Sequence, residues 1–77
     1  MTTGRIEALA SARKLCRGLT SAPSPQARAR ELFQLLSRAN GWETSEALAI
    51  AEFGAWLESR PAPGGLKGRC EQLLNQL

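Results

Sequence analysis

The chain has 77 residues, 43% of them hydrophobic, and a net charge of +3. This length fits one domain, residues 1–77, which buries only about 60% of the surface of its unfolded chain. The sequence contains no His, Asp, Tyr or Val and only two Cys, so most side chains that carry acid–base chemistry or bind metals near neutral pH are absent, and the composition argues against an enzyme, a metal site or a cofactor.

Residues 4–18 are predicted to form the first helix. Gly18 and the proline-containing segment 21–25 should end it, because proline lacks an amide donor and disfavours helical geometry in the residue before it. The opposite side of this helix is basic, with Arg13, Lys14 and Arg17. The apolar positions recur at three- and four-residue steps within one sector of a helical wheel: Ala8, Leu9, Ala12, Leu15, Cys16 and Leu19.

Residues 25–40 are predicted to form the second helix. Ser24 is the expected N-cap, with a side chain that accepts a hydrogen bond from a free end amide, and Pro25 takes the first helical position. Gly41 is the expected left-handed residue that closes the helix. The apolar stripe is broad, so we expect this helix to be central: Ala29, Leu32, Phe33, Leu35, Leu36 and Ala39.

Residues 45–60 are predicted to form the third helix, with Glu46 in its first turn, where a negative charge suits the helix dipole. One face is bulky, with Ile50, Phe53 and Leu57 among its residues. A second face is small, and small residues at four-residue spacing let another helix approach closely, so we expect it to contact either a second copy in a homodimer or a partner helix. This second face consists of Ala47, Ala51, Gly54 and Ala55.

Residues 66–77 are predicted to form the fourth helix after a Pro- and Gly-rich break at residues 61–65. Its narrow apolar stripe includes Leu66, Cys70 and Leu73. Exposed amides and two cations at its start could bind an anion, although the spacing of a P-loop is missing and an ordinary inter-helix loop is the simpler interpretation. The candidate anion-binding residues are Gly64, Gly65, Lys67 and Arg69. Together the four segments predict an all-α fold, a compact bundle of four short helices.

The two cysteines, Cys16 and Cys70, lie within apolar stripes, which predicts that they are small buried hydrophobic residues. A disulfide between them is the alternative, provided that the first and last helices are neighbours and the compartment is oxidising. Cys16 has no His to act as a base, and Glu7 lies on another side of the same helix, so a catalytic thiol is disfavoured.

Carboxylates on the third helix do not form a catalytic pair. Glu46, Glu52 and Glu58 are spaced so that they point in three directions, which predicts solvated charges. Their presence also argues against a helix-turn-helix in which this helix reads DNA, because three acids would be held against phosphates.

Positive charge is concentrated in residues 1–40, which carry seven Lys or Arg and two Glu, whereas residues 41–77 carry three Lys or Arg and five Glu. This uneven distribution predicts an acidic partner for the first half of the chain, unless the cations form an ordinary solvated face. Trp42, between the second and third helices, either clamps the entry of the third helix or anchors a partner. The candidate partner-binding residues are therefore Arg13, Lys14, Arg17, Arg28, Arg30 and Trp42.

We therefore expect a non-catalytic adaptor, regulator or inhibitor that docks on a larger protein; phage- or bacterium-encoded inhibitors of larger assemblies are one such class. The alternative is a small basic nucleic-acid-binding module, although the basic region lacks the interleaved aromatic residues that stack on bases. No apolar run approaches the length of a membrane span, and Arg5 and Glu7 interrupt any secretory signal, so a cytoplasmic protein without a membrane partner is expected.

Overall fold

The computed structural model describes residues 4–21 and 23–77; residues 1–3 and Ala22 of the predicted domain lie outside the described residues. It confirms the all-α class and the four predicted helices. These are α1 (Arg5–Arg17), α2 (Pro25–Arg38), α3 (Thr44–Glu58) and α4 (Leu66–Gln76), with a short 3-10 turn, η1 (Pro63–Gly65), directly before α4.

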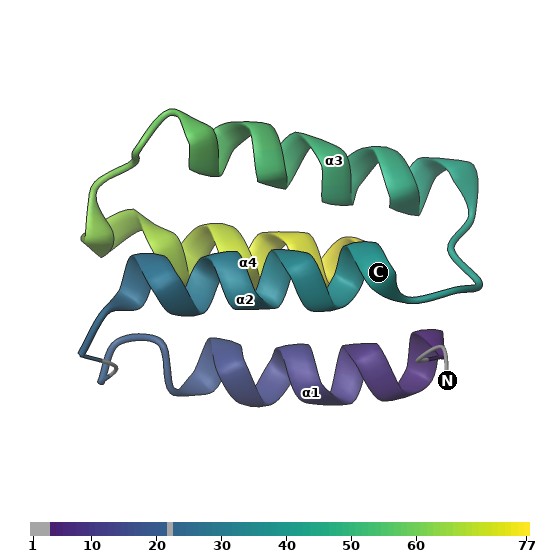
Figure 1. The fold of residues 1–77 in the computed structure, drawn as a ribbon, viewed down its shortest axis with the longest axis horizontal. Coiled ribbons are helices and arrows are strands. Elements are labelled where there is room, and N and C mark those ends of the chain that lie inside the picture. The colour runs from purple at the N-terminus through teal and green to yellow at the C-terminus, as the bar shows by residue number, and fades with distance from the viewer. Residues whose placement is uncertain (1–3, 22) are drawn as a thin grey trace.

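The helices form a compact bundle with extents of 30 × 21 × 20 Å. Both α1 and α3 pack against α2 and α4, and they lie on opposite sides of these two helices (Figure 1). The start of α1 is close to the end of α4, because the Arg5 side chain donates a hydrogen bond to the backbone oxygen of Leu77. Helices α1 and α4 therefore run antiparallel beside each other.

The apolar stripes of all four helices meet in one core. Phe53 of α3 is fully buried, as are Leu32 and Leu36 of α2. Full burial of a side chain of this size stabilises the fold by about 1.5–3 kcal/mol. The other large side chains that are fully buried are Leu19, Leu66 and Cys70.

The ends of α2 differ in part from the prediction. Pro25 takes the first position after the N-cap Ser24, but the Ser24 side chain makes no capping hydrogen bond. At the other end, Ala39 is already extended, with ψ 153°, and Gly41 adopts the expected left-handed conformation, φ 97°, outside the helix. The indole Nε1–H of Trp42 donates to the Leu36 carbonyl at 2.7 Å, which also accepts a hydrogen bond from the backbone N–H of Ala39 at 3.2 Å. A side chain therefore helps to satisfy the last turn of α2.

The predicted small face of α3 does not act as one surface. Gly54 is buried, and a Cβ atom at this position would lie 2.5 Å from two ring atoms of Phe33. Gly54 therefore admits the Phe33 ring of α2 within the fold and is not available to an outside helix, which corrects its assignment to an oligomer contact. Ala47, Ala51 and Ala55 are exposed.

Candidate functional site

A groove between α1 and α4 brings together cations that lie far apart in the sequence. Arg13 and Arg17 are one turn apart on α1, and Lys67 lies on the antiparallel neighbour α4. The cavity volume is about 360 Å³, at the lower end of the range for small-molecule pockets. We call this feature the basic groove; its lining residues are Arg13, Cys16, Arg17, Lys67, Glu71, Leu74 and Asn75.

The basic groove combines positive walls with an apolar floor. Arg13 and Arg17 are exposed, and Lys67 is half-buried. Glu71 is its one acid, and the Lys67 Nζ atom lies 3.9 Å from a carboxylate oxygen of Glu71. Within residues 4–21 and 23–77, Arg13 and Arg17 take part in none of the ion pairs. Two cations therefore remain available to an outside anion.

Cys16 and Leu74 provide buried apolar surface at the base of the groove. Burial raises the pKa of the Cys16 thiol, the Glu71 carboxylate raises it further, and Lys67 acts in the opposite direction. Burial, followed by the neighbouring Cys16 and Glu71, raises the pKa of Cys70 to about 12. Both residues are free thiols and stay protonated near neutral pH, so neither is a ready nucleophile.

The rest of the predicted basic cluster lies elsewhere. Lys14 and Arg28 line a separate cavity beside the α1–α2 loop, and Arg28 forms an exposed ion pair with Glu31 at 2.8 Å. Arg30 is exposed and lines neither cavity. The five predicted cations therefore do not form one surface. The structure instead brings Lys67 together with Arg13 and Arg17.

The predicted anion-binding loop does not assemble as one cradle. Lys67 lies on the α1 side of α4, in the basic groove and near Gly64. Arg69 lies on the α3 side of the same helix, where its guanidinium stacks 5.3 Å from the centre of the Trp56 ring. Because the two cations diverge, they cannot bind the same anion, and this prediction is wrong for the pair.

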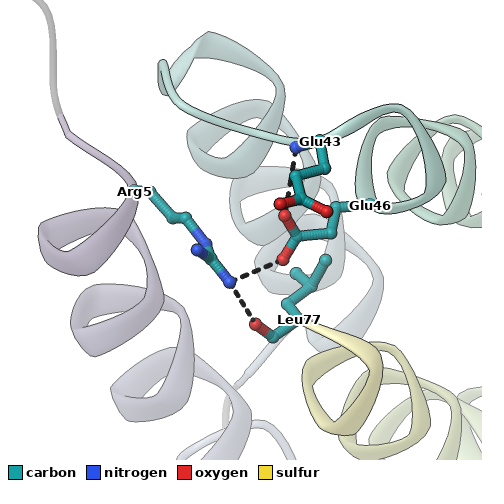
Figure 2. A network of polar contacts seen from close by, with 4 residues as sticks. All are labelled: Arg5, Glu43, Glu46 and Leu77. Carbon is teal, nitrogen blue, oxygen red and sulfur yellow. Dashed lines mark hydrogen bonds and ion pairs between the residues drawn. The ribbon is translucent and has the colours of Figure 1, made fainter.

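A polar network at the opposite end of the bundle brings together residues that the sequence analysis did not connect (Figure 2). Arg5 donates to the Glu46 carboxylate at 2.7 Å and to the Leu77 backbone oxygen at 3.0 Å. The backbone N–H of Glu43 donates to the other carboxylate oxygen of Glu46 at 3.0 Å. Glu46 is only 8% exposed, which corrects the expectation that it is a solvated charge.

This network joins α1, α3 and the end of α4, and it also reaches Trp42, whose ring centre lies 5.8 Å from the Arg5 guanidinium carbon. Both carboxylate oxygens of Glu46 already accept hydrogen bonds, and the Trp42 indole N–H is bound to Leu36. The half-buried Trp42 thus clamps the exit of α2 within the fold. The polar groups at this end of the molecule therefore bind one another and stabilise the bundle.

A second feature of the surface is the outer side of α3, which we call the Leu48 face. Leu48 is 59% exposed, and helical spacing places Glu52 on one side of Leu48 and Glu58 on the other. Its residues are Ala47, Leu48, Ala51 and Ala55, all of which are exposed.

None of the helices in the described ranges combines the length and apolar character needed to cross a bilayer. In the same ranges, no cluster of three or more Cys or Glu side chains is placed to hold a metal ion. Comparison of this chain with family models, with curated proteins and with solved structures found no match.

Proposed function

We propose that this chain is a non-catalytic adaptor, regulator or inhibitor that docks on a larger protein by holding an acidic segment of that protein in the basic groove. One observation carries the proposal: Arg13, Arg17 and Lys67 converge on one apolar-floored cavity from two helices. Cations arranged in this way increase the rate of association with an acidic surface and fix its register, while the apolar floor supplies contact area.

The composition of the groove favours a protein partner over nucleic acid. Glu71 lies among the cations and would repel a phosphate backbone. The lining includes no aromatic ring on which a base could stack. In contrast, an acidic helix with one or two apolar side chains could place these side chains over Cys16 and Leu74 and its carboxylates beside the arginines.

Binding rather than catalysis is also supported by the chemistry of the buried thiols. Cys16 and Cys70 have raised pKa values, and the chain contains no His to draw off a proton. The lack of an activated thiol therefore favours binding over thiol-based catalysis in the groove.

The proposal is tested by titrating the protein with a labelled helical peptide that carries Glu residues on both edges of a Leu-containing face. We expect the double variant R13E/R17E to bind this peptide at least about tenfold more weakly than the parent chain, because reversal replaces attraction with repulsion. The matched control is R30E/R38E, which changes net charge equally on the exposed side of α2 and should leave affinity within about twofold.

A generic DNA duplex is the second probe in the same titration. Tight duplex binding that falls steeply with salt and is lost in R13E/R17E would favour the nucleic-acid-binding alternative. Equal peptide affinity in R13E/R17E and R30E/R38E would overturn the assignment of the groove as the partner-binding site.

A further inference from the structure

The surface carries an acidic helix face of the kind that the basic groove should accept. We propose that a second copy of this chain docks its Leu48 face into the basic groove, so that molecules associate head to tail. This inference rests on the proposed function, because it names an occupant for the same groove. It also makes self-association a competitor of the outside partner.

The charges of the two surfaces are complementary. Glu52 and Glu58 flank Leu48 on its two sides, and α3 contains no Lys or Arg between Thr44 and Glu58. The basic groove has arginines on its α1 wall and Lys67 on its α4 wall. A helix laid along the groove can therefore present a carboxylate of α3 to the arginines of the α1 wall.

Exposed hydrophobic side chains also favour this association. Among the described residues, two large hydrophobic side chains are exposed, Ile6 at 83% and Leu48 at 59%. Ile6 is seven residues before Arg13 and eleven before Arg17, which places all three in one line along α1. Leu48 belongs to the docking face, whereas Ile6 lies outside the lining of the groove and extends its α1 wall. Head-to-tail association can cover both side chains.

The distance from Leu48 to Glu58 along α3 is similar to the distance from Ile6 to Arg17 along α1. Leu48 and Glu58 are ten residues apart, which corresponds to about 15 Å at the helical rise. Ile6 and Arg17 are eleven residues apart, or about 16 Å. When Leu48 of one copy lies against Ile6 of the next, Glu58 reaches the level of Arg17 in the same orientation.

A symmetric pairing of two Leu48 faces is disfavoured by the same charges. A two-fold axis would bring together the Glu52 and Glu58 side chains of two copies, and α3 itself carries no cation to offset the repulsion. Because α1 and α3 lie on opposite sides of the bundle (Figure 1), the head-to-tail contact uses two different surfaces. Such a heterologous contact builds short chains that lengthen with concentration, unless the rotation closes a ring.

Two variants, each blocked on one surface, test this arrangement by sedimentation equilibrium. R13E/R17E blocks the groove, and L48Q/A51Q blocks the Leu48 face with polar, uncharged side chains at exposed positions. The average mass of the parent chain should rise above the monomer mass of 8.3 kDa as the protein concentration increases. High salt should reduce this rise. Each variant alone should stay at the monomer mass.

An equal mixture of the two variants should give a discrete species of twice the monomer mass, because one intact face meets one intact groove. R30E/R38E is the matched control and should associate like the parent chain. Circular dichroism verifies that all variants keep the helical content of the parent.

Dimers of R13E/R17E alone would indicate symmetric pairing through α3 and overturn the inference, as would a parent chain that stays monomeric or a mixture that does not associate. In the last two cases, continued peptide binding by the parent chain would show that the proposed function survives without self-association.

Discussion

At the scale of single residues, the buried thiols make a direct prediction about reactivity. Because burial moves the pKa of Cys70 from its ordinary value of 9.0 to about 12, its thiolate fraction near neutral pH is about a thousandfold lower than that of an exposed thiol. Alkylation of native Cys70 should therefore be far slower than alkylation of the unfolded chain. Peptide mapping after timed iodoacetamide treatment measures this, and equal rates in the two states would contradict the buried position.

The same pKa shift predicts how stability depends on pH. Between about pH 9 and 12 the unfolded chain loses the Cys70 proton while the folded chain keeps it, so the unfolded state binds fewer protons and the free energy of unfolding falls as pH rises. The contribution is complete below pH 9. Urea unfolding across this range should show a shallower fall for Cys70→Ala than for the parent chain, and identical slopes would contradict the prediction.

The Arg5–Glu46 pair predicts a stability difference between two otherwise similar substitutions. Glu46→Gln removes the buried partner of the Arg5 guanidinium and should lower the free energy of unfolding by about 1–3 kcal/mol. Glu58→Gln changes an exposed residue of the same helix and should stay within about 0.5 kcal/mol. Urea denaturation of both variants is the measurement, and equal effects would show that the network does not stabilise the bundle.

The sequence did not reveal this pair, because its partners are 41 positions apart and carry no local signature. Glu46 occupies the first turn of a helix, where a solvated acid is common, so local reasoning placed it outside. Only the packing of the bundle brings the Arg5 side chain, at the start of α1, within hydrogen-bond distance of Glu46 in the first turn of α3. Burial of an acid at a helix N-terminus is thus a property of the packed molecule.

At the scale of helices, the close packing at Gly54 predicts that one added methyl group lowers the free energy of unfolding. A Cβ at this position would lie 2.5 Å from the Phe33 ring, so Gly54→Ala must displace that ring or separate α2 from α3. We expect a loss of about 1–3 kcal/mol in the free energy of unfolding, although alanine has the higher helix propensity. Thermal or urea unfolding measures the loss, and a gain in stability would contradict the close approach.

Gly68 offers the same chemical change in an open environment. It lies in α4, and no atom is within 4 Å of a Cβ built there. Gly68→Ala should therefore raise the free energy of unfolding by about 0.5–1 kcal/mol, because alanine loses less backbone entropy in a helix. The opposite signs of the two Gly→Ala substitutions, measured under one set of conditions, separate helix propensity from packing.

The helices themselves could be predicted because their apolar periodicity is strong and proline and glycine mark their limits. The ends of the helices were harder to predict, because the end of α2 depends on the hydrogen bond from the Trp42 indole to the Leu36 carbonyl. The assignment of Gly54 failed for a related reason. A small residue signals close approach, but the sequence does not tell which neighbour approaches, and here it is Phe33 of the same chain.

At the scale of the whole molecule, helices on opposite sides of the bundle carry different charges (Figure 1). Helix α1 carries Arg13 and Arg17, whereas α3 carries Glu52 and Glu58 beside the exposed Leu48 and has no Lys or Arg. The excess of cations in the first half of the chain can be counted in the sequence. The sequence could not predict that Lys67, from the second half, joins Arg13 and Arg17, because this depends on α1 and α4 being neighbours.

The central claim, that the basic groove holds an acidic partner segment, is tested most directly by NMR of the isotope-labelled parent chain titrated with the Glu- and Leu-containing peptide. The largest changes in backbone amide chemical shift should map to Arg13, Arg17, Lys67 and Leu74, with little change at Arg30 or Arg38. Changes confined to α2 or α3, or no saturable change at all, would contradict the claim.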